Sequence, residues 1–127
     1  PAGRFSIGRF GDNRARLLLA KNPAGWAESL LVMASDPVVL AIDSAIADGT
    51  DVSWLWDVEF ERLAGRHVVC TGPRAQDLAV RLSYAEVDHE VVDSLREAMA
   101  RPYEGTVDVL ATYTAFLNLC KMGGVEW

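Results

Sequence analysis

The chain has 127 residues, of which 50% are hydrophobic and 24% are charged, so length and composition indicate one globular domain with a sizeable core. The formal net charge is −6, which argues against a protein that binds nucleic-acid phosphates through clustered lysines and arginines. No apolar run approaches the roughly 20 residues that cross a bilayer, and no signal peptide is visible. We therefore expect no nucleic-acid partner and no transmembrane segment.

The first fourteen residues, PAGRFSIGRFGDNR, are rich in glycine and arginine. They read as a linker from an upstream domain (residues 1–14), which leaves residues 15–127 as the folded domain. RLLLA at 16–20 is a candidate buried strand. After a short loop, four apolar residues share one face of a predicted helix: Ala27, Leu30, Leu31 and Ala34.

A second strand is predicted at VVLAI (38–42) and a third at HVVCT (67–71). Between them, a short helix that ends at Gly65 is predicted from the spacing of Trp56, Phe60, Leu63 and Ala64. After the third strand, a longer helix is predicted from Ala75, Leu78, Ala79 and Leu82.

HEVV at 89–92 and VDVLA at 107–111 are the last two strand candidates. Ser94 and Glu97 form a capping box for a helix between them, which contains Leu95, Ala98 and Met99. Residues 115–122 are apolar nearly all round and predict a well-covered terminal helix. Apolar strands that alternate with amphipathic helices predict an α/β fold, with a mainly parallel sheet of five to six strands and helices on both faces.

Several common catalytic motifs are absent from the sequence. It has neither GxxxxGK[ST] nor GxGxxG, no GxSxG elbow, and only a weak phosphate cue in TGPRAQD (71–77). Cys70 and Cys120 lie in apolar segments and read as buried free thiols of a reducing cytoplasm. His67 and His89 read as surface or hydrogen-bonded histidines. We do not expect the chain to be a complete enzyme by itself.

The segment IADGTDVSWLWDVEFERL, residues 46–63, concentrates carboxylates and tryptophans after the second strand. Ligands of open parallel sheets gather beyond the carboxyl ends of the strands. Four aspartates lie there: Asp43, Asp48, Asp51 and Asp57. Each suits a turn or a helix cap. A loop braced by Trp54 and Trp56 can also present carboxylates to a metal, or to a histidine from elsewhere.

Four stretches, LLLAKNPAGW, IADGTDVSWLWDVEFERL, VVCTGPRAQDLAVRLSYAEV and ATYTAFLNL, resemble in order and spacing the C-terminal domain of the MurT family. MurT proteins are the Mur-ligase-like subunits of bacterial lipid II isoglutaminyl synthase, and the resemblance runs from Gly3 to about Leu119. It implies a Rossmann-like Mur ligase C-terminal domain. In the family, MurT uses ATP and Mg²⁺ to activate the D-glutamate α-carboxylate of the lipid II stem peptide. Ammonia released by a glutaminase subunit then forms D-isoglutamine.

The resemblance also implies roles for individual residues. Asp51, the second aspartate of the DGxD motif, would orient the catalytic histidine of the glutaminase and complete a Cys-His-Asp triad. Arg4 corresponds to a linker arginine that contacts the nucleotide, and Lys21 and Asn22 to a loop that closes over ATP. Asp43 departs from the family, which usually has asparagine there.

The ATP-binding P-loop and the cysteine-rich zinc ribbon of a full MurT are absent from this sequence. The resemblance therefore implies an excised domain that is inactive alone and binds neither cofactor nor metal by itself. It implies a heterodimer with the glutaminase that acts on lipid II in peptidoglycan synthesis, in the cytoplasm at the inner face of the cell membrane. Two alternatives stay open: the C-terminal domain of a plain Mur-type amino-acid ligase without a glutaminase, and a carboxylate-lined metal-binding module.

Overall fold

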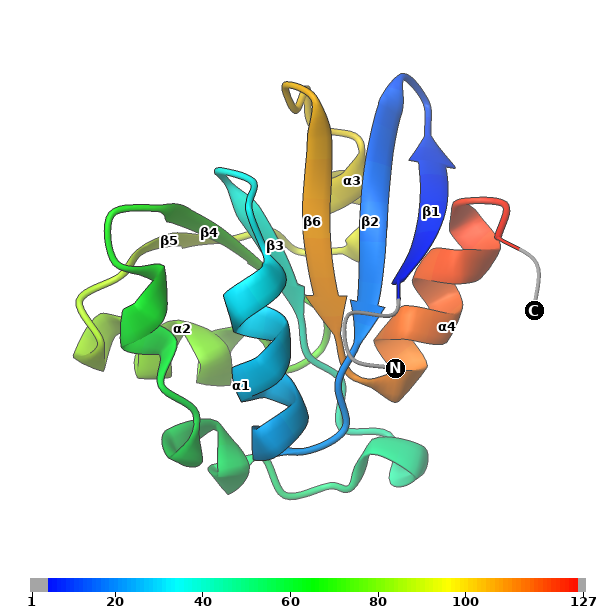
Figure 1. Cartoon of the computed structure of the whole chain (residues 1–127). Helices are drawn as coiled ribbons and strands as arrows, with labels where there is room; N and C mark the ends of the chain where they lie inside the picture. Colours follow the sequence, from blue (N-terminus) through cyan, green and yellow to red (C-terminus); the bar gives the residue numbers. More distant parts are fainter. Residues whose placement is uncertain (1–4, 126–127) are drawn as a thin grey trace.

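The computed structural model describes residues 5–125 and contains a six-stranded sheet with helices packed against both faces (Figure 1). The strands are β1 (Phe5–Phe10), β2 (Asn13–Leu19), β3 (Val38–Ala41), β4 (His67–Thr71), β5 (Asp88–Val91) and β6 (Thr106–Ala111). Their order across the sheet is β1-β2-β6-β3-β4-β5. Strand β1 is antiparallel to β2, and the other neighbours are parallel. The predicted α/β class and mainly parallel sheet are confirmed.

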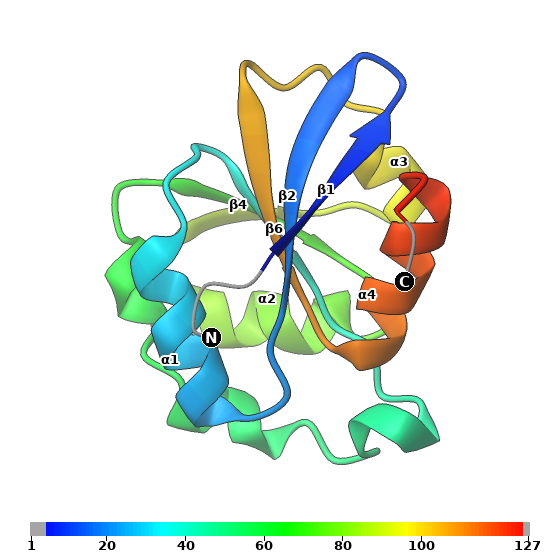
Figure 2. The ribbon, with the colours of Figure 1, turned by 45° about the vertical axis from the view of Figure 1, so that its right-hand side comes forward.

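Within residues 5–125, the α-helices are α1 (Pro23–Val32), α2 (Ala75–Tyr84), α3 (Leu95–Met99) and α4 (Tyr113–Met122). Helices α1 and α2 cover one face of the sheet and α3 and α4 the other (Figures 1 and 2). Three short 3₁₀ helices lie between β3 and β4: η1 (Ile46–Asp48), η2 (Ser53–Asp57) and η3 (Phe60–Leu63). None of the helices in the described part of the chain has the length and hydrophobicity to span a membrane.

The central strands are buried on both faces because successive side chains enter two different hydrophobic cores. In β3, Val38 and Leu40 pack with residues of α1 and α2, whereas Val39 and Ala41 pack with residues of α3 and α4. Runs such as VVLA are therefore continuously apolar. Apart from the helix predicted around Trp56 and Phe60, the other predicted strands and helices are confirmed, with small shifts at their ends.

The β1–β2 hairpin corrects the expectation of a linker over residues 1–14. Residues 5–14 form β1, a turn and the beginning of β2, so they belong to the sheet. Gly11 takes a φ of 61° at the turn. At Gly8, a Cβ would lie only 2.9 Å from the Phe10 ring, so a larger residue would displace that ring. Arg4 lies outside the described residues.

The buried face of α1 also differs from the prediction. Trp26, Leu30 and Met33 face the core, whereas Leu31 is 67% exposed. The predicted and the observed buried faces of α1 share Leu30. The larger side chain of Trp26 occupies the core in place of the predicted Ala27. The periodicity was therefore correct, but the assigned face was rotated.

The single helix predicted from Trp56, Phe60 and the residues after it is instead two 3₁₀ helices, η2 and η3. The carbonyls of Leu55 and Val58 accept hydrogen bonds from the Arg81 guanidinium of α2, at 3.1 and 2.7 Å. A side chain from a later helix therefore takes the carbonyl groups that a continuous α-helix would use. Gly65, with a φ of 87°, ends the segment as predicted.

Candidate functional site

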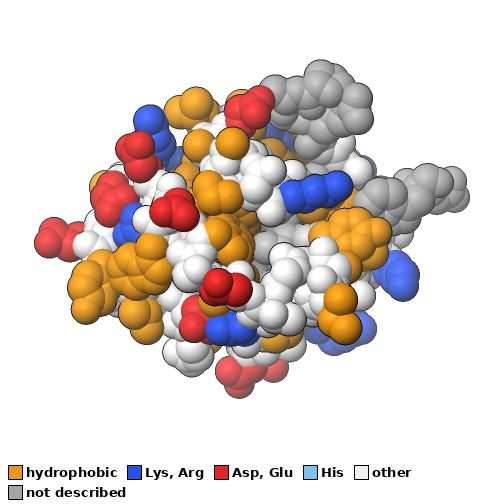
Figure 3. Space-filling view, turned by 90° about the horizontal axis from the view of Figure 1, so that it is seen from below, with side chains coloured by type: hydrophobic (Ala, Val, Ile, Leu, Met, Phe, Trp, Pro, Cys, Tyr) orange, Lys and Arg blue, Asp and Glu red, His pale blue; other side chains and the backbone are white. Residues whose placement is uncertain are grey.

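The carboxyl ends of the parallel strands meet at the lower edge of the sheet in Figure 1. The long connection from β3 to β4, residues 42–66, runs across this edge. Open parallel sheets bind ligands at such an edge. Figure 3 views the molecule from this side, where hydrophobic, acidic and basic side chains are interspersed.

Two aspartates attach the connection to the beginning of α4. Asp48 Oδ1 accepts a hydrogen bond of 2.8 Å from the Thr114 backbone N–H, in the first turn of α4. Asp43 Oδ1 accepts one of 3.0 Å from the Ala45 N–H, and the Asp43 N–H donates to Thr112 Oγ1 at 2.8 Å. The turn and cap interpretation is therefore confirmed for Asp43 and Asp48.

Arg74 holds the same connection from the other side. Its guanidinium donates to Ser44 Oγ at 3.2 Å and to the Thr50 carbonyl at 3.5 Å, and it pairs with Asp77 at 2.7 Å. Gly72 permits this approach, because a Cβ there would lie 2.6 Å from a backbone oxygen of the connection. The arginine of the TGPRAQD segment therefore anchors a loop.

Arg81 is the second anchor, and it is only 6% exposed. Besides the carbonyls of Leu55 and Val58, it binds the Glu61 carboxylate at 3.0 Å. Sequence reasoning missed both arginines. The available signal was a charged residue at position 81, between buried positions of an amphipathic helix. Nothing in the sequence identified its partners.

The two tryptophans of the connection are placed differently. The Trp54 ring packs on Trp26, with ring centroids 5.4 Å apart, and the neighbouring Leu55 is buried. The expected bracing role is therefore confirmed for Trp54. Trp56 is 51% exposed, and its ring meets the Tyr84 ring edge to face at 5.2 Å.

Asp51 is exposed between these anchored parts of the connection. Its Oδ1 accepts a hydrogen bond of 2.8 Å from the Ser53 backbone N–H. That bond, with the Ser53 hydroxyl and the charge of Arg74, lowers the pKa of Asp51 below its ordinary value. The carboxylate is therefore ionised at neutral pH and accessible to solvent. Asp57 is also exposed, and its side chain forms no hydrogen bond or ion pair with another described residue.

A cavity of about 310 Å³ lies between the β2–α1 loop and the β3–β4 connection. It is lined by Ala20, Lys21, Ala47, Asp48, Trp54, Thr112 and Tyr113. Lys21 is exposed at this cavity, which neither Asn22 nor Asp51 lines. The Asn22 side chain instead caps α1, because its Oδ1 accepts a hydrogen bond of 2.9 Å from the Gly25 N–H.

The aspartates of this edge do not form a metal site. Across residues 5–125, no group of three or more His, Cys, Asp or Glu residues is arranged to hold a metal ion. Asp43 and Asp48 bind different backbone groups, and Asp51 binds a third. The structure therefore offers no ligand set for the metal-binding alternative among these residues.

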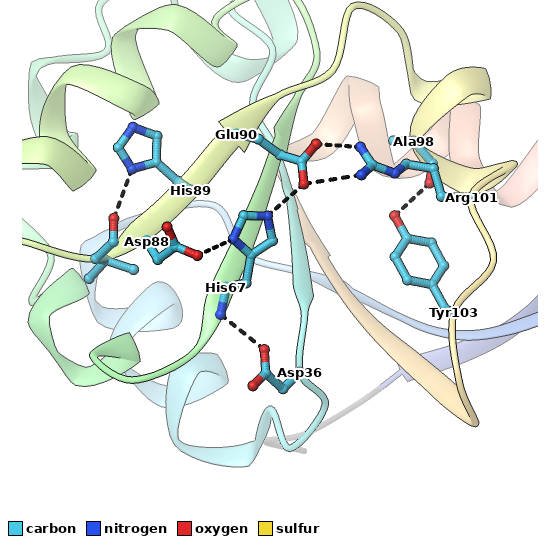
Figure 4. Close-up of polar contacts among 9 residues, drawn as sticks. Asp36, His67, Asp88, His89, Glu90, Ala98, Arg101 and Tyr103 are labelled. Carbon is cyan, nitrogen blue, oxygen red and sulfur yellow. Dashed lines mark hydrogen bonds and ion pairs between the residues drawn. The ribbon is translucent and has the colours of Figure 1, made fainter.

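A second polar cluster lies at the opposite end of the strands, where β4 and β5 begin (Figure 4). The His67 ring lies between two carboxylates, with Nδ1 2.6 Å from Asp88 and Nε2 2.6 Å from Glu90. Glu90 also pairs with Arg101. Burial opposes the charged imidazole, but the two carboxylates raise the pKa of His67 above its ordinary value. These groups satisfy one another, as expected for a hydrogen-bonded histidine.

Comparison with known proteins relates the sequence of this chain to a family. The family model described as MurT ligase C-terminal matches residues 19–116. The chain is 33% identical over 130 residues to the lipid II isoglutaminyl synthase (glutamine-hydrolyzing) subunit MurT of two Staphylococcus aureus strains. It is 30% identical over 133 residues to the protein of the same name from Streptococcus pneumoniae. Each match covers 94% of this chain and 30% of the relative, so the chain spans less than a third of those proteins.

Proposed function

Because this chain belongs to the MurT ligase C-terminal family, we propose that it is the C-terminal domain of a MurT subunit. The complete subunit would use ATP and Mg²⁺, with ammonia from a glutaminase partner, to amidate the D-glutamate α-carboxylate of lipid II. It would act in the cytoplasm at the inner face of the membrane, and its zinc ribbon would belong to another part of the subunit. The names of the relatives, subunits of a glutamine-hydrolysing lipid II isoglutaminyl synthase, support this proposal.

The observation that carries the proposal is the state of Asp51. The carboxylate is exposed and ionised, and its only hydrogen-bonding partner among the described residues is Ser53. A carboxylate that accepts the N–H of an imidazole selects its tautomer and stabilises the imidazolium ion. We assign Asp51 this role toward the catalytic histidine of the partner, as the third member of a Cys-His-Asp triad.

The anchoring of the loop supports this role over simple capping. An Asx turn explains the bond between Asp51 and Ser53 and requires no other contact. The connection is nevertheless held at Asp48, Arg74 and Arg81. These anchors restrict the positions that Asp51 can take, and orienting a partner's imidazole requires such preorganisation.

The β2–α1 loop supports the ATP-dependent half of the proposal. Lys21 is exposed at the end of a parallel strand, where its ammonium group can pair with a phosphate oxygen. Asn22 fixes the start of the next helix and is exposed. We propose that both residues, together with Arg4, close over a nucleotide held by another domain. The sequence has no phosphate loop. These residues would therefore cover a nucleotide whose phosphate loop lies in another domain.

The proposal is tested by Asp51→Asn in the full-length subunit assembled with its glutaminase. This substitution in a serine protease triad lowers turnover by about four orders of magnitude. A thiolate nucleophile depends less on its third member, so we expect glutamine hydrolysis to fall about 10²- to 10³-fold. Assembly should survive, because the exposed side chain keeps its shape.

Asp57→Asn is the matched control, because Asp57 is an exposed aspartate of the same connection. Wild-type glutamine hydrolysis in Asp51→Asn would contradict the triad role. If the full-length protein joins an amino acid to its substrate and does not co-purify with a glutaminase, the alternative of a plain Mur-type ligase domain is correct.

A further inference from the structure

Three exposed hydrophobic side chains lie together, one on the β3–β4 connection and two on helix α2. The exposed fractions are 51% for Trp56, 53% for Val80 and 74% for Tyr84. Val80 and Tyr84 are one helical turn apart on α2 and share one face of that helix. The rings of Trp56 and Tyr84 are in edge-to-face contact, with centroids 5.2 Å apart. We call these three residues the aromatic patch.

The aromatic patch is held in place by the protein beneath it. The Arg81 guanidinium carbon lies 5.3 Å from the centroid of the Trp56 ring. Arg81 also binds the carbonyls of Leu55 and Val58, on either side of Trp56. Rigid Trp and Tyr side chains lose little entropy on binding, and they are enriched among the residues that dominate protein interfaces.

The position of the patch relates it to Asp51. Asp51 and Trp56 are five residues apart, so their Cα atoms are separated by at most about 17 Å. A standard interface buries about 800 Å² on each partner, which corresponds to a disc of about 16 Å radius. The upper limit of this separation is close to that radius, so the footprint of a protein that brings a histidine to Asp51 can include Trp56.

We propose that the aromatic patch is the surface on which the glutaminase partner anchors, an inference that rests on the proposed function of Asp51. The partner would present an apolar pocket to Trp56 and Tyr84, surrounded by lysine or arginine side chains. Such a rim would complement the exposed carboxylates Asp51 and Glu59 of the same connection.

Charge also separates this partner from a second copy of the chain. A two-fold contact through the patch would place the same carboxylates of two copies near one another. Their nearest compensation is weak, since the Glu59 carboxylate lies 3.9 Å from the Arg62 guanidinium and Asp51 has no ion pair among the described residues. Each copy also has a net charge of −6. Like-charge juxtaposition therefore disfavours self-association through this surface.

The test measures the Kd between the full-length subunit and the glutaminase for Tyr84→Ser and for the Trp56→Ser/Tyr84→Ser double variant. We expect Kd to rise at least about tenfold for Tyr84→Ser and further for the double variant. At saturating glutaminase, glutamine hydrolysis should return to near the wild-type rate, because Asp51 is unchanged. Val32→Ser is the control: Val32 is 42% exposed and lies near the beginning of β6, at the other end of the strands. It should leave Kd within about twofold.

An unchanged Kd in the double variant, with the fold verified by circular dichroism, would overturn the inference. Loss of glutamine hydrolysis in Asp51→Asn would then still support the proposed function by itself. If the wild-type subunit does not bind a glutaminase at all, both the inference and the proposed function are wrong. The wild-type subunit could instead form a homodimer that the double variant converts into a monomer while the Kd for the glutaminase is unchanged. This result would assign the patch to a second copy and also overturn the inference.

Discussion

At the amino end of β4 and β5, Asp88 and Glu90 enclose His67, whereas at the carboxyl edge Asp51 stands exposed with Ser53 as its partner. Glu90 is further neutralised by Arg101. Both regions are rich in carboxylates, but those of the first are paired with cations of the same chain. Asp51 in contrast forms no ion pair among the described residues, so its carboxylate is available to a group from another molecule.

Removing an anchor of the carboxyl edge should have the largest effect on stability. Arg81→Ala leaves the carbonyls of Leu55 and Val58 without this donor and leaves Glu61 without its cation. We expect the free energy of unfolding, measured with urea, to fall by about 3 kcal/mol. Arg62→Ala is the control, since its ion pair is long and exposed. A loss below about 1 kcal/mol would show that the connection is not held by Arg81.

This anchor also explains why part of the fold could not be predicted from the sequence. The runs at 38–42, 67–71 and 107–111 were recognisable as strands because burial on both faces requires continuous apolar residues. The helix around Trp56 was wrong because Arg81 takes the carbonyls of Leu55 and Val58, a contact across 26 and 23 residues. Such a tertiary contact overrides the local pattern.

Strand β1 was missed for a different reason. Phe5 is 48% exposed at its beginning, Arg9 is exposed near its end, and Gly8 lies inside it. The segment therefore has neither a continuous apolar run nor a clean alternation. Its pairing with β2 is visible only in three dimensions.

Lys21→Met separates the role proposed for the β2–α1 loop in ATP-dependent amidation from the role proposed for Asp51 in glutamine hydrolysis. If the ammonium group of Lys21 pairs with a phosphate of ATP, its loss should lower ATP-dependent amidation at least about tenfold. Glutamine hydrolysis by the assembled complex should stay near wild type, because Lys21 is not part of the Asp51 connection. Both rates are measured on one preparation of the full-length complex. A parallel fall in both would indicate a damaged fold and contradict the separate role of Lys21.

A pH series tests the ion pairs of His67 at the amino end of β4 and β5. The folded protein raises the pKa of His67, so its pairs with Asp88 and Glu90 stabilise the fold fully below the unfolded pKa of about 6.5. This contribution is lost as pH rises through the folded pKa. Between pH 6 and pH 9, the stability difference between wild type and His67→Gln should therefore shrink by about 1 kcal/mol.

The measurement is urea unfolding at each pH. His89→Gln is the matched control, because the His89 ring contacts the Val87 carbonyl at 2.8 Å and no carboxylate. A stability difference for His67→Gln that is equal at both pH values would contradict the ion-pair account of this end.

The smallest effect is expected at Asp57. The side chain is exposed and without an ion pair among residues 5–125, so Asp57→Asn should change the free energy of unfolding by less than about 0.5 kcal/mol. Glutamine hydrolysis should also be unchanged. A large loss of activity would move the functional carboxylate away from Asp51.

In the candidate site, as in the fold, contacts between residues far apart in the sequence could not be predicted. Asp51 could be selected from the sequence because its motif is local and resembles that of a known family. Arg74 could not be assigned its role, because it reaches Ser44 and Thr50 across 30 and 24 residues. The sequence therefore indicated which carboxylate to consider, and the structure shows what keeps it in place.

The most direct test of the account is the ratio of glutamine-driven to ammonium-driven amidation in the Asp51→Asn complex. Free ammonium bypasses the glutaminase, so a residue that serves only the partner's histidine should affect one supply of nitrogen and spare the other. We predict that the ratio falls at least about 10²-fold while ammonium-driven amidation stays near wild type. A ratio equal to that of the wild type would contradict the assignment of Asp51 to the partner's active site.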